Sequence, residues 1–175
     1  MFSLFWGLWS YLFSKAELHL LIVGLDDAGK TTLLEQLKSI FSKKTGIPLD
    51  KIPPTERLRA IWNKYYSESH GIVFVIDSAN EGRFQEAKET LHAMLSNPEL
   101  SGIPLLVLAN KMDLEDAQTV NHISGMLDLV DHQGAVASYS VCVLTKEGIE
   151  GAMNWLVDAV KSSDRFYEKS AAGGT

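Results

Sequence analysis

The sequence predicts an α/β fold with a doubly wound, mostly parallel β-sheet, preceded by an N-terminal amphipathic helix. Short apolar runs alternate along the chain with longer segments of helical periodicity. Strands that are apolar at every position are typical of parallel sheets covered by helices on both faces. The chain has 175 residues, of which 46% are hydrophobic and 22% are charged. This length is enough for one domain with a core and too short for two.

The first 14 residues, MFSLFWGLWSYLFS, predict an amphipathic helix. Ser3, Gly7, Ser10 and Ser14 share one narrow face of such a helix, and apolar side chains cover the rest. The apolar run is too short to span a bilayer, which takes about 20 residues. Two interpretations stay open: a core helix packed on the domain, or a helix that binds a membrane surface or the groove of a partner, such as a membrane-protein receptor. The tryptophans suit a membrane interface and favour the second interpretation.

The remaining elements follow from periodicity and from turn residues. We expect a strand over residues 18–23, a helix to about 41, a loop over 42–55, a short helix over 56–67, a strand over 71–77, a helix over 81–96, a strand over 103–109, a weaker helix over 120–130, a strand over 136–143 and a helix over 148–161. The expected organisation is therefore an amphipathic helix over 1–14, one globular domain over 16–163 and a flexible tail over 164–175.

The composition argues against several classes of function. A net charge of −6 gives no overall attraction to the phosphate backbone of nucleic acids, so we expect no nucleic-acid partner. Cys142 is the only cysteine in the sequence, so the chain has no internal disulfide and no cysteine-based zinc site. The five histidines show no ligand spacing. We assign them no chemistry.

Residues 24–31, GLDDAGKT, match the pattern G-x-x-x-x-G-K-[ST] between a predicted strand and a predicted helix. Glycines let backbone amides approach phosphate oxygens, and the helix N-terminus adds partial positive charge. Lys30 would contact the β- and γ-phosphates, and the Thr31 hydroxyl would bind Mg²⁺. The sequence therefore predicts a P-loop NTPase. The expected phosphate-binding residues are Asp26, Asp27, Ala28, Gly29, Lys30, Thr31 and Thr32.

A second motif, Asn110-Lys111-Met112-Asp113, follows a predicted buried strand. Ligands bind at the carboxyl ends of strands in open α/β sheets. A carboxylate at Asp113 accepts hydrogen bonds from both N1–H and the exocyclic amine of guanine. Adenine lacks this donor pair, so a buried Asp113 would reject adenine by leaving polar groups unpaired.

Together with the leading aromatic helix and the stretch from Cys142 to Thr145 that precedes Gly148 and Trp155, these motifs resemble the Arf family of small GTPases. The Met1-Phe2 start, the "DD" in the phosphate loop and RLRAIWNKYYSESHGIVFVIDSAN are most similar to its Arf-related branch. The resemblance implies a monomeric GTP/GDP switch with Mg²⁺. It also implies exchange factors, effectors and a cytoplasmic location, peripheral to Golgi (trans-Golgi) membranes, in vesicle trafficking.

The resemblance also implies roles for individual residues. Asn110 and Asp113 would bind guanine, and Lys111 would brace the phosphate loop. Between Cys142 and Leu144, the backbone of Val143 would contact the guanine carbonyl. Val143 replaces the usual Ala of the family, which is a mild change because a backbone N–H makes the contact.

The junction at Pro54-Thr55-Glu56-Arg57 departs from the family pattern. In the family, the residue matching Thr55 is a switch threonine and a Mg²⁺ ligand. It is followed by two antiparallel strands and a D-x-G-G-Q loop, roughly two dozen residues in all. In this chain Glu56 follows at once. Because the water-orienting Gln is missing, we expect no catalytic residue in this chain and impaired switching and hydrolysis.

Loss of an antiparallel hairpin leaves two ends that lie side by side, so the core can close. The strand over 18–23 would then lose a neighbour and become an exposed apolar edge. We therefore predict a protein that is less stable than a complete relative and that aggregates as its concentration rises. Thermal melts at several concentrations check this prediction. A two-state melt with a high midpoint and no concentration dependence would contradict it.

Asp77 ends a predicted strand, where a metal-binding aspartate sits in some P-loop proteins. We favour a structural role for it over a metal role. Three functions remain: a guanine-nucleotide-binding Arf-related protein with impaired switching, a non-hydrolysing decoy that holds membrane or partners through its N-terminus, and a P-loop phosphotransferase using Asp77. The third is disfavoured because no acceptor site or arginine-rich lid is visible.

Overall fold

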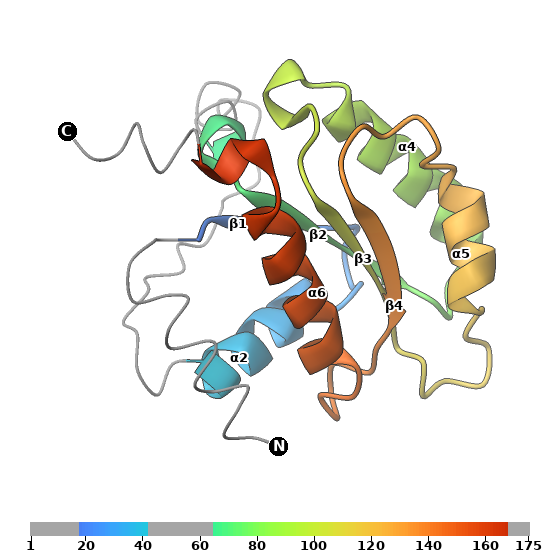
Figure 1. Cartoon of the computed structure of the whole chain (residues 1–175). Coiled ribbons are helices and arrows are strands. Elements are labelled where there is room, and N and C mark those ends of the chain that lie inside the picture. Colours follow the sequence, from blue (N-terminus) through green and yellow to red (C-terminus); the bar gives the residue numbers. More distant parts are fainter. Residues whose placement is uncertain (1–17, 42–64, 168–175) are drawn as a thin grey trace.

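The computed structural model describes residues 18–41 and 65–167 (Figure 1). The predicted N-terminal helix, the loop over 42–55 with Thr55, and most of the helix predicted over 56–67 lie outside the described residues, as do residues 168–175. Of that last helix, residues 65–68 are described and are helical.

In the part of the chain that the structure describes, four parallel strands form the sheet, in the order β1-β2-β3-β4. They are β1 (Leu20–Val23), β2 (Gly71–Asp77), β3 (Leu105–Asn110) and β4 (Val136–Ser140). The two central strands, β2 and β3, are buried along almost their whole length. This explains their continuous apolar sequences, because a strand covered on both faces has no solvent side for polar residues.

Helices cover both faces of the sheet (Figure 1). They are α2 (Lys30–Phe41) and α6 (Ile149–Lys161) on one face, with α4 (Phe84–Leu95) and α5 (Val120–Leu127) on the other. Alternate residues of β2 enter two separate cores: Phe74 packs with α4 and α5, whereas Val73 and Val75 pack with α2 and α6. The predicted α/β class with a doubly wound parallel sheet is confirmed.

The sheet ends earlier at β4 than the sequence predicted. Val141 N–H still donates to the carbonyl of Ala109 at 2.9 Å, but Cys142 N–H donates to Glu147 instead, at 3.1 Å. The chain therefore turns into a tight loop over residues 142–147, and the last two residues of the predicted strand, Cys142 and Val143, lie outside the sheet. The end of this strand cannot be predicted from hydrophobicity, because Val141, Cys142 and Val143 are all buried.

Residues 164–167, which we expected to begin the flexible tail, form a helical turn packed on the domain. The Arg165 guanidinium donates to the carbonyls of Ser69 and Tyr66, each at 2.8 Å. The ring of Phe166 lies edge-on against His70, 5.6 Å between centroids. The ordered domain therefore extends past residue 163, because two side chains anchor this turn to the segment that precedes β2.

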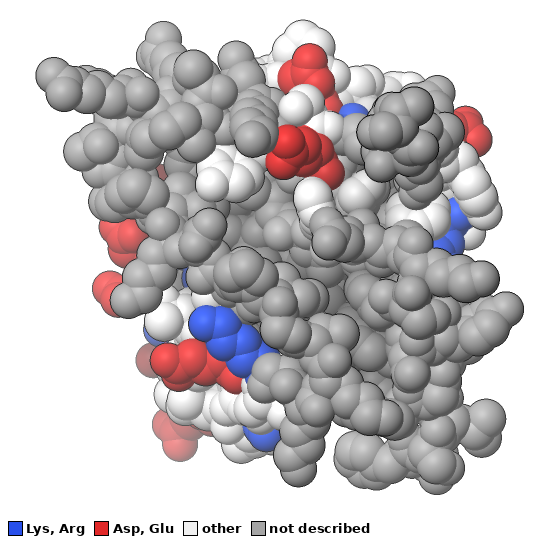
Figure 2. All heavy atoms as spheres, turned by 90° about the vertical axis from the view of Figure 1, so that its left-hand side faces the viewer, with Lys and Arg blue, Asp and Glu red and all other residues white. Residues whose placement is uncertain are grey.

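Within the described residues, β1 pairs with β2 alone and forms one edge of the sheet. Leu20 and Ile22 are half-buried there. On the face shown in Figure 2, the described acidic and basic side chains are interspersed rather than gathered into one basic patch. No helix in the described part of the chain is long and apolar enough to cross a membrane.

Candidate functional site

A cavity of about 860 Å³ lies where the carboxyl end of β3, the loop after β1 and the loop after β4 meet. It is lined by Asp26, Asp27, Gly29, Lys30, Thr31, Thr32, Asn110, Lys111, Asp113, Leu114, Cys142, Val143 and Leu144. Two expected site residues are not in this lining: Ala28 is buried in the core, and Thr55 lies outside the described residues. Three segments far apart in the sequence thus share one cavity.

The loop over residues 24–29 has a backbone that only glycine tolerates at two points. Gly24 has a φ of +147°, and a Cβ there would lie 2.1 Å from the carbonyl oxygen of Val75. Gly29 has a φ of +103°, and a Cβ there would lie 2.3 Å from Nδ2 of Asn110. Both the left-handed backbone and the close approach require the glycines of the motif. Helix α2 starts directly after this loop, so its N-terminus faces the cavity.

The side chain of Lys30, the first residue of α2, contacts the loop that precedes this helix. Its ammonium donates to the carbonyl of Leu25 at 2.5 Å. Burial lowers the pKa of Lys30, and the carboxylates of Asp26 and Asp27 act in the opposite direction. Thr31 and Thr32, in the first turn of α2, line the cavity beside it.

The side chain of Asn110 ties two loops together, a role that the sequence did not reveal. It is 4% exposed, its Nδ2 donates to the carbonyl of Ala28 at 2.8 Å, and its Oδ1 accepts from Val143 N–H at 3.0 Å. Asn110, rather than Lys111, braces the phosphate loop. The Val143 N–H expected to meet guanine is donated to this amide, although Val143 still lines the cavity.

Lys111 and Asp77 form an ion pair with 2.6 Å between Nζ and Oδ2. The other oxygen of Asp77 accepts from Ala79 N–H at 3.0 Å. Both carboxylate oxygens are therefore occupied, which favours the structural role of Asp77. Lys111 has a φ of +66°, so the chain turns sharply after β3 and directs this lysine toward the end of β2 instead of the phosphate loop.

Asp113 is exposed, not buried as we expected, because it lies at the rim of the cavity. The buried thiol of Cys142 donates to its Oδ1 at 3.2 Å. This contact orients the carboxylate. Two exposed leucines, Leu114 and Leu144, flank the same region, and the first was missed by the motif.

The oxygen donors fit a magnesium ion in part. Thr31, whose side chain carries a hydroxyl, lines the cavity. Across residues 18–41 and 65–167, no cluster of three or more His, Cys, Asp and Glu side chains is suited to a metal. Mg²⁺ needs no such cluster when substrate phosphates and water supply most of its ligands. The described residues therefore fit a magnesium ion held mainly by phosphate, with Thr31 as a protein ligand.

Comparison with known proteins agrees with this geometry. Residues 5–160 match the model of the ADP-ribosylation factor family. The chain is 36% identical to ADP-ribosylation factor-related protein 1 of Bos taurus, over 91% of this chain and 93% of the relative. It is 35% identical to the protein of that name from Homo sapiens over the same shares. It is also 35% identical to ADP-ribosylation factor-like protein 3 of Saccharomyces cerevisiae, over 90% of this chain and 92% of the relative.

The alignment with the bovine relative covers 187 positions, more than the 175 residues of this chain. The relative therefore carries residues inside the aligned region that have no counterpart here. With a family match across most of its length, a parallel α/β sheet and a glycine-rich loop at the end of its first strand, this chain belongs to the ADP-ribosylation factor family of small GTPases.

Proposed function

We propose that this protein binds GDP and GTP together with Mg²⁺ and that it switches and hydrolyses GTP poorly. One observation carries the proposal: the phosphate loop and the segment that would recognise guanine line a single cavity and are joined by Asn110. Membership of a family of small GTPases supports the guanine nucleotide as the ligand.

The cavity has two chemically different ends. At one end, Lys30 and the N-terminus of α2 offer positive charge to phosphate groups. At the other end, Asp113 offers carboxylate oxygen to the N–H groups of guanine, and Leu114 and Leu144 offer apolar contact to the faces of the base. The separation of these two chemistries within one cavity suits a nucleotide.

Poor hydrolysis follows from what the cavity lacks. The described residues that line it include no glutamine, histidine or glutamate that would orient a water molecule. Residues present in the relatives and absent from this chain support loss of the segment expected after Thr55. Small GTPases without an activating partner are already slow, so little turnover would remain.

We place the protein at the cytoplasmic surface of Golgi (trans-Golgi) membranes, in vesicle trafficking. The amphipathic pattern of residues 1–14 supports contact with a membrane surface or a membrane-protein receptor. Family membership supports exchange factors and effectors as further partners, with the chain acting as a monomer.

Titration with fluorescent analogues of GDP, GTP and ATP, with and without Mg²⁺, tests this function. We expect guanine-selective binding that Mg²⁺ strengthens and GTP turnover slower than that of a complete relative. Lys30→Gln removes a phosphate contact, so it should weaken binding of all three analogues. Absence of guanine-nucleotide binding would instead favour the non-hydrolysing decoy. A preference for ATP would exclude guanine recognition. GTP turnover as fast as that of a complete relative would contradict impaired hydrolysis.

A further inference from the structure

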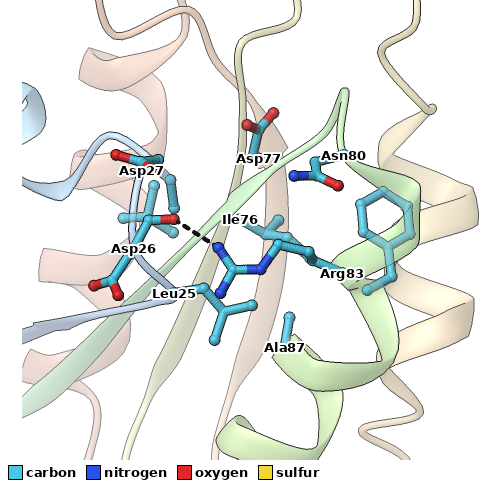
Figure 3. Close-up of a pocket in the computed structure, with 11 residues that line it drawn as sticks. Leu25, Asp26, Asp27, Ile76, Asp77, Asn80, Arg83 and Ala87 are labelled. Carbon is cyan, nitrogen blue, oxygen red and sulfur yellow. Dashed lines mark hydrogen bonds between the residues drawn. The ribbon is translucent and has the colours of Figure 1, made fainter.

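A second, smaller cavity of about 60 Å³ lies beside the phosphate loop, between the end of β2 and the start of α4 (Figure 3). Asp26 and Asp27 line both this cavity and the nucleotide cavity. Its basic residue is Arg83, from the 3₁₀ turn η2 (Glu81–Arg83) that leads into α4. Arg83 belongs to neither nucleotide motif.

The Arg83 guanidinium is held in place and points at the phosphate loop (Figure 3). Its Nε and Nη2 donate to the two carboxylate oxygens of Glu86, at 2.8 and 3.1 Å. Its Nη1 donates to the carbonyl of Asp26 at 3.2 Å. An arginine carries five N–H donors, so these three bonds leave two donors for another acceptor.

Two cations thus converge on adjacent carbonyls of the same loop. Lys30 donates to the carbonyl of Leu25, and Arg83 donates to the next one, that of Asp26. Burial is the main cause that lowers the pKa of Lys30, the carboxylates of Asp26 and Asp27 raise it, and the positive charge of Arg83 has a smaller lowering effect. A phosphate group beside both cations would be attracted by both charges.

The position of Lys30 indicates which phosphate would lie there. The lysine of a phosphate loop reaches the β- and γ-phosphates. Arg83 contacts the same loop at the carbonyl of Asp26, next to the Leu25 carbonyl that Lys30 contacts. The guanidinium therefore lies beside the cation that binds the terminal phosphates, of which GTP has the γ-phosphate and GDP does not. A phosphate oxyanion is also a stronger hydrogen-bond acceptor than a neutral carbonyl.

We propose that Arg83 is a specificity-determining residue that makes this protein favour the nucleoside triphosphate over the diphosphate, by turning its guanidinium from the Asp26 carbonyl to the terminal phosphate. The inference rests on the proposed nucleotide binding and assigns this chain a γ-phosphate contact outside its motifs. Glu86 acts as a positioning residue for this guanidinium.

Dissociation constants for GDP and for a non-hydrolysable GTP analogue test the proposal. We expect Arg83→Gln to weaken binding of the GTP analogue about tenfold, the effect of losing one exposed charge-assisted hydrogen bond. Binding of GDP should change less than about twofold, since GDP has no γ-phosphate. Arg83→Lys should lose part of the preference for the GTP analogue, because a lysine keeps the charge but lacks the planar set of N–H donors of a guanidinium. Glu86→Gln should also lose part of this preference, because the Arg83 guanidinium is then held less firmly.

Lys88→Gln is the matched control. It removes one positive charge from α4, the helix that η2 leads into, where Lys88 pairs with Asp128 at 3.4 Å and lines neither cavity. The ratio of the two dissociation constants should be unchanged in this variant. A thermal melt of each variant checks that the fold is intact.

Three results would overturn the inference. If Arg83→Gln weakens GDP and the GTP analogue equally, or leaves both unchanged, Arg83 only holds the loop. If Lys88→Gln lowers the preference as much, the effect is one of overall charge. If the unsubstituted protein binds neither nucleotide, the proposed function and this inference both fail. If it binds both nucleotides and Arg83→Gln does not change the preference, only this inference fails.

Discussion

Replacing Asn110 with Ala will lower the free energy of unfolding by about 2–6 kcal/mol and will remove most of the nucleotide affinity. The buried amide donates to the carbonyl of Ala28 and accepts from Val143 N–H. Without it both backbone groups lose their partner, and each buried unsatisfied group costs about 1–3 kcal/mol. Affinity falls as well, because the phosphate loop is no longer tied to the loop that follows β4.

Chemical denaturation measures the first effect, and titration with fluorescent GDP measures the second. Asn121→Ala is the matched control, because it makes the same chemical change at a residue that is exposed on α5 and does not line the cavity. It should alter stability by less than about 0.5 kcal/mol. Equal destabilisation by the two variants would show that the bonds of Asn110 do not hold the site together.

Replacing Asp113 with Asn will lower the affinity for guanine nucleotides by about a hundredfold or more and raise the relative affinity for xanthine nucleotides. An aspartate offers two acceptor oxygens to the two N–H groups of guanine. An asparagine offers one acceptor oxygen and one amide NH2 group. This NH2 group and the exocyclic amine of guanine are both donors, so they cannot form a hydrogen bond. Mismatched polar groups in a binding site cost several orders of magnitude in selectivity. Xanthine carries a carbonyl at that position, and this carbonyl accepts a hydrogen bond from the asparagine NH2 group.

Competition of GDP, XDP and ADP against a fluorescent nucleotide measures the change in selectivity. Asp116→Asn serves as the control, because Asp116 is an exposed acid three residues further along the same loop and lines neither cavity. It should leave the ranking of the three nucleotides as it is. A ranking that is the same in Asp113→Asn as in the unsubstituted protein would rule out base recognition by Asp113.

The sequence predicted the fold because its signals are local. The buried strands β2 and β3 and the helices α2, α4 and α6 each carry their own periodicity, and hydrophobic periodicity depends only on near neighbours in the chain. The ends of α5 and β4 were less well predicted. Thr119 caps α5 by accepting from His122 N–H at 3.2 Å, and Asp128 ends it in a left-handed conformation.

Most of the residues that line the cavity were singled out by the sequence, but their contacts were not. The phosphate loop and the Asn110–Asp113 motif are marked by residue type and spacing alone. Which partner each side chain takes depends on segments that only the folded chain brings together. Asn110 lies 82 residues from Ala28, and Lys111 lies 34 residues from Asp77. No pattern within one segment shows such a pairing.

By itself, the sequence determined the class of fold, the family and the position of the phosphate loop. The tertiary structure alone decided that Asn110 rather than Lys111 braces the phosphate loop, that Lys111 neutralises Asp77, and that Arg83 reaches the loop from another element. The physical reason is the same in each case. Apolar periodicity specifies which residues are buried, whereas a hydrogen bond or ion pair depends on the few ångströms that separate groups from distant parts of the chain.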